Sequence, residues 1–281
     1  MIISDKILTK IIQPRPLQSH KGDFGRVLTI GGNINYGGAI IMATAASVSS
    51  GAGLVTCATN KENLTALHAR VPEAMFVNYF DKIALSDSIA SADVIILGPG
   101  LGDDIRAQEI VQVCLTNLRS RHTCIIDGSA ITIISQNTHL KELATTSAAQ
   151  IIYTPHQMEW QRLSHILIPE QTTSTSQKIQ AFLNATVILK KYHTEIFHKN
   201  RLISTLEIGG PYMATGGMGD TLAGILGGFI AQFNKNHNLN EIIDAAVYFH
   251  TYVAQELAKE NYVVLPTKLI SQIPAVMKKF E

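Results

Sequence analysis

The sequence predicts an α/β protein in which helices cover both faces of a mostly parallel β-sheet. Short β-rich runs alternate along the chain with helical stretches. A hydrophobic content of 46% with only 16% charged residues suits strands that are buried on both faces. The 281 residues are enough for one large α/β domain, and no repeat or linker divides them. We therefore expect a single domain over residues 1–281, built as a three-layer α/β/α sandwich.

Each expected element follows from a local pattern. The parallel strands are expected in the β-rich runs 26–32, 54–59, 93–100, 123–130 and 150–155. The crossovers that parallel strands require are supplied by helical stretches such as 38–50 and 104–119. A small antiparallel addition is predicted by three strand-like runs too closely spaced for helical crossovers, at 187–191, 194–199 and 201–206. The remaining helices are expected at 221–233, 240–260 and 267–280, the last kinked or ended at Pro274.

Composition and charge exclude several classes of protein. The formal net charge is +1, from 23 Lys and Arg against 22 Asp and Glu, so no overall field would attract nucleic acid or a membrane surface. Cys57, Cys114 and Cys124 form no CxxC pair, which fits neither a disulfide framework nor a zinc site. The N-terminal region lacks a secretory segment, and the uncharged stretch 36–60 is broken at Gly51–Gly53. We expect a cytoplasmic protein that binds neither nucleic acid nor membrane.

Glycines are concentrated after the expected strands. Gly31-Gly32 follows the first strand, residues 98–102 follow another and Asp127-Gly128 follow a third. In an open parallel sheet, ligands bind beyond the carboxyl ends of the strands, and glycine lets the backbone approach them closely. Tight turns favour glycine equally, so each run is ambiguous alone. Together they predict a site at this edge of the sheet.

The strongest local signal is a glycine loop, ATGGMGDTLAG at residues 214–224, that leads into an apolar helix. Free backbone N–H groups at such a helix start would converge on a phosphate, and the helix dipole would add favourable charge. Neither the P-loop pattern nor the G-x-G-x-x-G pattern of dinucleotide folds is present. Asp220 stands at the helix entry, where it could be an ordinary N-cap. Capping needs no cluster of glycines, so we favour a catalytic base that the dipole keeps ionised.

The same loop, from Met213 to Gly224, fits the longer pattern MATGG-x-GD-x-LAG. Similar segments precede it in a fixed order: HKGDFGRVLTIGG (20–32), SGAGLVTCAT (50–59), ILGPGLG (96–102), TPH (154–156) with Glu159, and VILK (187–190) with His193-Thr194. Together they resemble the nucleotide-dependent NAD(P)H-hydrate dehydratases of the ribokinase-like superfamily over residues 15–275.

This resemblance implies a ribokinase-like fold and a metabolite-repair reaction. In that family, NADH or NADPH hydrated at C6 is phosphorylated at the C6 hydroxyl by a nucleotide, and phosphate is then eliminated. Asp220 would accept the hydroxyl proton. The nucleotide contacts that the resemblance implies are Lys190, Lys191, Tyr192, His193, Thr194, Gly217 and Gly219. The implied substrate contacts are Ala39, Gly100, Gly102, His156 and Asp220.

Cofactor and assembly expectations also rest on the resemblance. The phosphoryl donor is ADP or ATP, and the lack of a transit segment favours ADP, which the bacterial-type members use. Mg²⁺ is expected because phosphoryl oxygens need charge neutralisation, but the sequence assigns no metal ligands. The substrates are hydrated NADH and NADPH. Because the family tends to assemble, we expect a homo-oligomer, specifically a tetramer.

Several positions depart from the family pattern. Gly128-Ser129 stands where a second carboxylate is expected, and Gln157-Met158 stands where Pro-Gly is usual. Lys191 replaces a glycine, and Met218 replaces Ser or Thr beside the expected anion hole. No role of the missing carboxylate can be transferred. These substitutions leave open a nucleotide-binding protein with weakened catalysis.

Two further alternatives remain open. A small-molecule kinase of the same superfamily would share Asp220 and the anion hole, although sugar kinases usually lack the MATGG extension and thiamine-precursor kinases tend to carry Cys in place of Asp. For single residues, His156 could simply cap a helix. Lys190 and Lys191 could form a solvated strand end.

Overall fold

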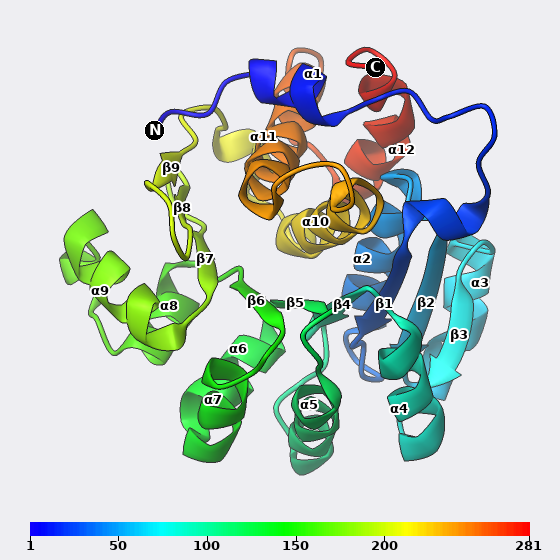
Figure 1. Ribbon diagram of the computed structural model, residues 1–281, viewed down its shortest axis with the longest axis vertical. Coiled ribbons are helices and arrows are strands. Elements are labelled where there is room, and N and C mark those ends of the chain that lie inside the picture. Colours follow the sequence, from blue (N-terminus) through cyan, green and yellow to red (C-terminus); the bar gives the residue numbers. More distant parts are fainter.

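A nine-stranded sheet forms the centre of the molecule, and the computed structural model describes all residues from 1 to 281 (Figure 1). The strand order is β3-β2-β1-β4-β5-β6-β7-β8-β9. The strands are β1 (Arg26–Ile30), β2 (Leu54–Thr59), β3 (Met75–Asn78), β4 (Val94–Leu97), β5 (Thr123–Ile126), β6 (Gln150–Tyr153), β7 (Thr186–Leu189), β8 (Glu195–Phe197) and β9 (Ser204–Thr205). Neighbours from β3 to β7 are parallel, whereas β8 pairs antiparallel with both β7 and β9. The predicted parallel sheet with an antiparallel addition is confirmed.

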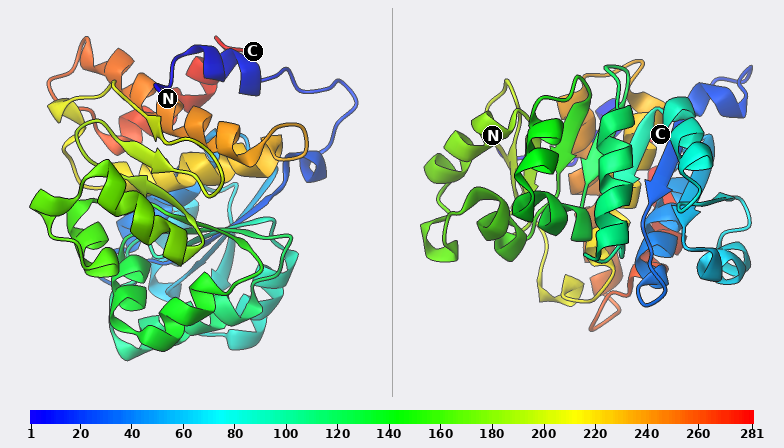
Figure 2. Two further views of the ribbon diagram at one scale, coloured as in Figure 1. Left: turned by 60° about the vertical axis from the view of Figure 1, so that its left-hand side comes forward. Right: turned by 90° about the horizontal axis from the view of Figure 1, so that it is seen from below.

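Helices cover both faces of this sheet (Figures 1 and 2). One layer contains α1 (Lys6–Ile11), α2 (Gly37–Ser49), α3 (Leu64–Arg70), α10 (Met218–Phe233), α11 (Leu239–Ala258) and α12 (Pro266–Met277). The other contains α4 (Lys82–Ser91), α5 (Ile105–Asn117), α6 (Ser129–Gln136), α7 (Thr138–Thr145) and α8 (Gln157–Ser164), and α9 (Thr173–Leu183) contacts α7 and β8. The predicted three-layer sandwich is confirmed.

Each central strand divides its side chains between two hydrophobic cores. In β4, Val94 and Ile96 belong to the core shared with α10, whereas Ile95 and Leu97 belong to the core shared with α5. Successive residues of a strand point to opposite faces, so a strand covered on both faces must be apolar throughout. This requirement accounts for the high hydrophobic content of the chain.

The strand order reverses between β1 and β4. From β1 the chain runs outward through β2 and β3, and it then returns to β4 on the other side of β1. The loops that follow β1 and β4 meet at this reversal, where the N–H of Asn33 donates to the carbonyl oxygen of Gly100 at 2.7 Å. Such a reversal opens a crevice beyond the carboxyl ends of the strands, which is the usual ligand position in open α/β sheets.

Helix α10 packs closely on α2 because its contact face is made of glycines. A Cβ on Gly224 would lie 2.3 Å from the carbonyl oxygen of Ala43, closer than any real Cβ contact. The Ser47 hydroxyl donates to the carbonyl oxygen of Gly224 at 3.1 Å, and a Cβ on Gly228 would lie 2.6 Å from the Cβ of Ser50. This backbone-to-backbone contact fixes α10, and therefore fixes where its first turn lies.

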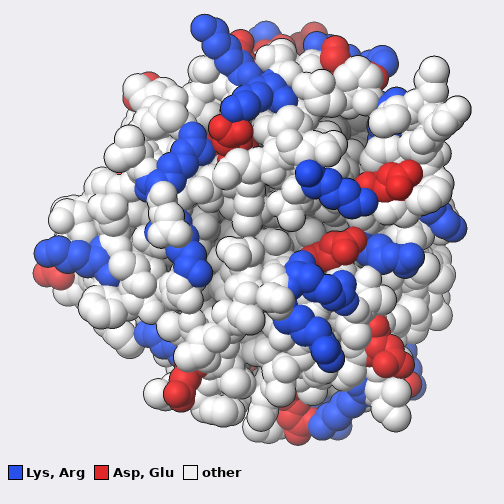
Figure 3. Space-filling model, viewed as in Figure 1, with Lys and Arg blue, Asp and Glu red and all other residues white.

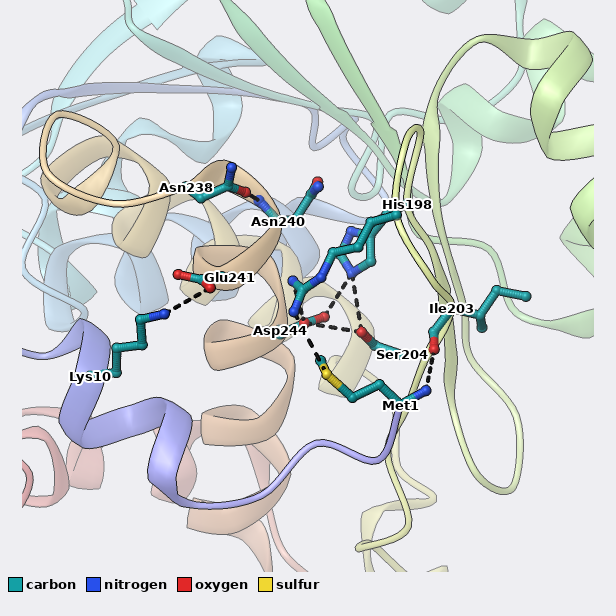
Figure 4. A network of polar contacts seen from close by, with 10 residues as sticks. Met1, Lys10, His198, Ile203, Ser204, Asn238, Asn240, Glu241 and Asp244 are labelled. Carbon is teal, nitrogen blue, oxygen red and sulfur yellow. Dashed lines mark hydrogen bonds and ion pairs between the residues drawn. The ribbon is translucent and has the colours of Figure 1, made fainter.

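The β8–β9 hairpin is fastened to α11 by a polar network (Figure 4). The Asp244 carboxylate lies 2.8 Å from His198 Nε2 and accepts hydrogen bonds from Ser204 Oγ at 3.0 Å and Arg201 Nη1 at 3.2 Å. The side chains of His198 and Asp244 are completely buried. A Ser, a His and an Asp also form hydrolase triads, but no substrate could reach this one. The network therefore serves to hold the hairpin in place.

The expected strands were too long at their carboxyl ends. The runs 93–100 and 123–130 end as strands at Leu97 and Ile126. Gly98 and Gly128 follow directly, with φ values of +119° and +53° that favour glycine and interrupt an extended strand. The glycines counted as part of the strand therefore belong to the loops.

Three other expectations were incomplete or wrong. Strand β3 was not predicted, because its four residues at the sheet edge carry no clear alternation. Helix α10 begins at Met218, three residues before the expected start, so it includes Asp220. Helix α12 does not end at Pro274 but continues to Met277, and the N–H of Lys278 donates to the Pro274 carbonyl oxygen at 3.1 Å.

The surface charges are mixed in sign on the face that is drawn. On the face drawn in Figure 3, Lys and Arg side chains are interspersed with Asp and Glu, so this face presents no continuous field of one sign. None of the helices combines the length and the apolar character needed to cross a membrane.

The α10–α2 contact generates a stability prediction. Gly224→Ala should lower the free energy of unfolding by about 1–3 kcal/mol, because its methyl group would overlap the backbone of α2. Gly38→Ala is the matched control, since a Cβ there meets nothing within 4 Å. It should leave stability unchanged or raise it by up to about 1 kcal/mol. Urea denaturation compares the two, and equal effects would contradict the close-packing argument.

Candidate active site

The first turn of α10 presents unpaired backbone donors beside Asp220. Gly217 precedes the helix with φ +92°, and the N–H of Thr221 is the first to donate back, to the carbonyl oxygen of Gly217 at 3.0 Å. The N–H groups of Gly219 and Asp220 have no hydrogen-bond partner in the protein. Free N–H groups at a helix start, reinforced by the dipole, attract anions such as phosphate.

An ammonium group faces this turn. Lys190 follows β7, and its Nζ would lie 3.1 Å from a Cβ added to Gly219. The same Nζ lies 3.0 Å from Oδ1 of Asp127, a buried residue that follows β5. Thr154, which follows β6, donates its hydroxyl to that oxygen at 2.6 Å. The ends of three adjacent strands therefore hold one cation next to the free N–H groups of α10.

The environment of Asp220 changes its acidity. Burial raises the pKa of this carboxyl to about 7, the negative charge of Asp127 contributes in the same direction, and Lys190 opposes them. The sequence predicts that the helix dipole keeps Asp220 ionised. That prediction is wrong, because burial and the neighbouring carboxylates outweigh the charges that favour the ionised form. A carboxyl that titrates near neutral pH is suited to act as a general base.

Two further charged groups complete the surroundings. Burial opposes the positive charge of Lys190, but Asp127 and Glu159 outweigh it and raise the pKa of the ammonium. Burial also raises the pKa of Glu159, while Lys190 acts in the opposite sense. Lys190 is therefore a cation shared among three carboxylates, Asp127, Glu159 and Asp220.

His156 caps helix α8. Its Nδ1 accepts hydrogen bonds from the backbone N–H groups of Met158 at 3.1 Å and Glu159 at 3.2 Å. The backbone N–H of His156 in turn donates to Oε2 of Glu159 at 2.8 Å. Burial and the charge of Lys190 lower the pKa of the imidazole, so it is neutral near pH 7. The capping alternative is therefore correct, and only Nε2, on a side chain that is 53% exposed, remains available to a ligand.

A cavity of about 690 Å³ lies beside the first turn of α10. All five residues of the predicted nucleotide loop line it, together with His156 and Gly219: Lys190, Lys191, Tyr192, His193 and Thr194. The buried His250 of α11 also lines the cavity, its Nε2 has no hydrogen-bond partner, and burial lowers its pKa to about 4. The structure thus brings together the predicted nucleotide residues, with the exception of Gly217.

Gly217 has a different environment. A Cβ on Gly217 would lie 2.4 Å from Cε of Met42 on α2. Gly217 does not line the 690 Å³ cavity and lies against α2. The nucleotide contact that the resemblance implies for it stays a prediction. The positive φ of Gly217 and this packing account for the glycine.

Three of the five predicted substrate residues, Ala39, Gly100 and Gly102, lie at the strand reversal, whereas His156 and Asp220 lie at the nucleotide site. A Cβ on Gly100 would lie 2.9 Å from the Cβ of Ala39, which places both residues in one contact. Gly102 donates its N–H to Ser129 Oγ at 3.1 Å. The loop of Gly98 packs on the backbone of Asp127, where its Cβ would meet the carbonyl oxygen at 2.0 Å. Asp127 therefore lies between the strand reversal and Lys190.

Known proteins are similar to this chain in sequence and fold. A sequence model of the NAD(P)H-hydrate dehydratase family matches residues 27–275. An ADP-dependent (S)-NAD(P)H-hydrate dehydratase from Enterococcus faecalis is 48% identical over 99% of this chain and 93% of its own. The chain belongs to the NAD(P)H-hydrate dehydratase family. A relative with the same name from Streptococcus thermophilus is 43% identical over 99% of each chain. A solved structure of a ribokinase-like superfamily protein from Enterococcus faecalis has a TM-score of 0.94 and 48% identity, covering 99% of this chain and 95% of that one.

The departures from the pattern of the dehydratase family have local structural roles. Ser129, in place of the second carboxylate, accepts the hydrogen bond from Gly102 that joins two loops. Lys191 forms an ion pair with Glu195 at 2.7 Å, and Thr173 also donates to that carboxylate, at 2.5 Å. Met218 is buried and lines the cavity. Ser129 and Lys191 are therefore accommodated by contacts of their own.

No group of three or more His, Cys, Asp or Glu side chains is arranged to hold a metal ion. Asp127 is engaged by Lys190 and Thr154, and Glu159 is engaged by the N–H of His156. The side chains of this dehydratase do not form a metal cage of their own.

Sequence reasoning missed the roles of Asp127 and Glu159, and it did not consider His250. Asp127 was recognised only as part of a strand-end turn, and Glu159 only as part of a similar segment. The signal that could have identified Asp127 is its place directly after β5, because the next two strands of the sheet, β6 and β7, are followed directly by Thr154 and Lys190. His250, in the middle of an apolar helix, gave no such signal.

The raised pKa of Asp220 predicts a pH-dependent effect on stability. The folded pKa of about 7 lies above the ordinary 3.8, so the folded protein binds more protons between these values and loses stability as the pH rises through them. Asp220→Asn removes that loss. The free energy of unfolding of Asp220→Asn, relative to that of the wild type, should therefore rise by about 2 kcal/mol from pH 4 to pH 8. This rise is smaller than the whole pKa shift would give, because the free N–H groups stabilise the ionised carboxylate.

Urea denaturation of both proteins at the two pH values measures this difference. Asp87→Asn, which changes an exposed carboxylate on α4, is the control and should show no such trend. A constant difference for Asp220→Asn would mean that its carboxyl is not destabilised by burial.

Proposed function

We propose that this protein is an ADP-dependent (S)-NAD(P)H-hydrate dehydratase, a carbon–oxygen lyase that restores NADH and NADPH from their C6-hydrated forms. The observation that carries the proposal is Asp220, a carboxyl with a pKa of about 7, set beside free backbone N–H groups and the Lys190 ammonium. This arrangement suits transfer of a phosphoryl group to a hydroxyl. The names of relatives at 48% and 43% identity indicate which hydroxyl and which donor.

The nucleotide is proposed to bind in the 690 Å³ cavity. Its terminal phosphate would meet the N–H groups of Gly219 and Asp220 and the ammonium of Lys190. Lys191 to Thr194 would line the remainder of the nucleotide, with the exposed ring of Tyr192 and the half-buried ring of His193, 4.0 Å apart, at its edge. Gly217, the residue before α10, is proposed to contact the same phosphate, as the family resemblance implies.

The hydrated dinucleotide is proposed to bind at the strand reversal. Ala39, Gly100 and Gly102 would contact it through backbone that has no bulky side chain in the way. His156 Nε2 carries the proton of the neutral ring, because Nδ1 accepts from α8, and it could donate to a pyrophosphate oxygen. Asp220 would face the C6 hydroxyl.

The chemistry then needs two steps. Asp220 accepts the proton of the C6 hydroxyl. The hydroxyl oxygen bonds to the terminal phosphorus of ADP, and AMP leaves. Lys190 and the free N–H groups stabilise the charge on the phosphoryl oxygens. In the second step the ring nitrogen lone pair expels phosphate from C6, and loss of a proton from C5 completes the double bond. The products are the reduced dinucleotide, AMP and phosphate, without any net redox change.

Mg²⁺ is proposed to arrive on the nucleotide phosphates. Such an ion keeps several waters and needs few protein ligands, which agrees with the absence of a three-ligand cluster here. No step above depends on a protein-held metal ion.

Several wider expectations belong to the same proposal. We infer that residues 1–281 act as one domain and that the protein assembles as a homo-oligomer, a tetramer, which light scattering of the purified chain would test. A cytoplasmic location is inferred because the proposed substrates are intracellular dinucleotides and Cys57, Cys114 and Cys124 are all free thiols. ATP in place of ADP remains the alternative donor.

A direct assay tests the activity. Hydrated NADPH is incubated with the protein, Mg²⁺ and either ADP or ATP, and reduced-nicotinamide absorbance is followed. Recovery with ADP is expected, and kcat/KM should rise with pH through about 7 because Asp220 must be ionised to accept a proton. Asp220→Asn should lower turnover by about a thousandfold while nucleotide still binds. No recovery with either nucleotide, from a chain that binds both, would favour a small-molecule kinase or a binding protein instead.

The anion hole can be tested by binding alone. Gly219→Val should weaken ADP binding about tenfold or more, because even its Cβ would lie 3.1 Å from Lys190 Nζ and its methyl groups would project into the phosphate position. Gly216→Ala is the control, since a Cβ there meets nothing within 4 Å. Calorimetric titration of both variants decides, and equal affinities would remove the first turn of α10 from the phosphate site.

A further inference from the structure

We propose that Asp127 is a positioning residue of the phosphoryl-transfer site: its carboxylate, fixed by Thr154, holds the Lys190 ammonium against the first turn of α10 and leaves Asp220 free to act as a base. The identity of the transferred group rests on the proposed function. The placement of the ammonium does not.

The geometry that carries this inference joins three strand ends. Strands β5, β6 and β7 are neighbours, and Asp127, Thr154 and Lys190 follow them in that order. One oxygen, Oδ1 of Asp127, receives both the Thr154 hydroxyl at 2.6 Å and the Lys190 ammonium at 3.0 Å. The N–H of Lys190 donates to the carbonyl oxygen of Pro155 at 2.8 Å, which fixes the backbone from which the ammonium extends.

Stability alone does not account for this ion pair. The Asp127 side chain is 4% exposed and that of Lys190 is 23% exposed, so both charges are largely removed from water. A buried ion pair contributes little to stability compared with apolar side chains of the same size. Here the ammonium also lines the nucleotide cavity and lies next to Gly219, whose missing side chain leaves room for it. These features indicate a cation kept for a ligand.

Asp127 also decides which carboxylate Lys190 serves. Glu159 of α8 and Asp220 of α10 both interact with the same ammonium, and His156 and the buried His250 add to its surroundings. If Asp127 did not engage the ammonium, Lys190 would pair more closely with Asp220. Such a pairing would stabilise the ionised form of Asp220 and make it a weaker base. The negative charge of Asp127 further raises the pKa of Asp220 directly.

The first test is the pH profile of Asp127→Asn, which keeps the shape of the side chain and its contact with Thr154. The acid limb of kcat/KM should move to lower pH by about one unit, with a reduced kcat at its plateau. Glu142→Gln, an exposed carboxylate on α7, should leave both unchanged. An unmoved acid limb in a folded Asp127→Asn protein would overturn the proposal.

The second test needs no turnover. ADP affinity is measured by calorimetry for the wild type, Asp127→Asn, Lys190→Ala and the double variant. If Asp127 acts through Lys190, its substitution should weaken ADP binding about fivefold in the wild type and add nothing to Lys190→Ala. Unchanged or tighter binding by Asp127→Asn, or effects that multiply in the double variant, would contradict the proposal. So would a wild-type chain that binds no ADP.

Thr154→Val covers the case in which Asp127→Asn does not fold. It keeps both charges and removes only the hydroxyl that fixes Asp127, so both effects should recur in weaker form. The two proposals also fail separately. Wild-type protein that binds ADP without turnover would remove the dehydratase function, and the affinity cycle would still decide the role of Asp127. Active protein with additive variants would remove the role of Asp127 alone.

Discussion

The sharing of one ammonium among three carboxylates is the constraint on which this site depends. Lys190 balances only part of the charge of Asp127, Glu159 and Asp220, so all three cannot be ionised without cost in a partly desolvated place. Burial, reinforced by the negative charges of Asp127 and Glu159, raises the pKa of Asp220 to about 7. The raised pKa that suits Asp220 to accept a proton near neutral pH therefore arises from an electrostatically unfavourable arrangement. The free N–H groups and the Lys190 ammonium lie beside Asp220, so an incoming phosphate would contact these favourable groups.

Such an arrangement must be held by the rest of the fold. Glycine-mediated packing on α2 fixes the first turn of α10, and the reciprocal capping of His156 and Glu159 fixes the start of α8. The buried Asp244 network fixes the hairpin that follows the Lys190 loop (Figure 4). These contacts keep charged groups from separate elements close together, although the carboxylates among them repel one another.

The sequence predicted the fold class and the sheet edge that carries the site, because apolar runs and strand-end glycines are local signals. It also predicted a nucleotide role for Lys190 to Thr194, which form one contiguous loop and line one cavity in the structure; that role, and the role of Asp220 as the base, stay predictions. It could not predict the acidity of Asp220, since the dipole of its own helix is visible in the sequence but burial and the charge of Asp127, some ninety residues away, are not. The position of His250 in the cavity wall could not be predicted either, because the sequence does not show which cavity its helix lines.

The glycines of the α10 motif divide into two physical roles. Gly217 and Gly224 let α10 approach α2 so closely that added Cβ atoms would lie 2.4 Å from Met42 Cε and 2.3 Å from the Ala43 carbonyl oxygen. Gly219 instead leaves space for the Lys190 ammonium and for a phosphate at the free N–H groups. Helix packing and phosphate access are thus set within the first two turns of one rigid helix, so a shift in the packing would displace the anion site with it. The motif is specific because both requirements must be met in so few residues, and a capping aspartate alone would impose neither.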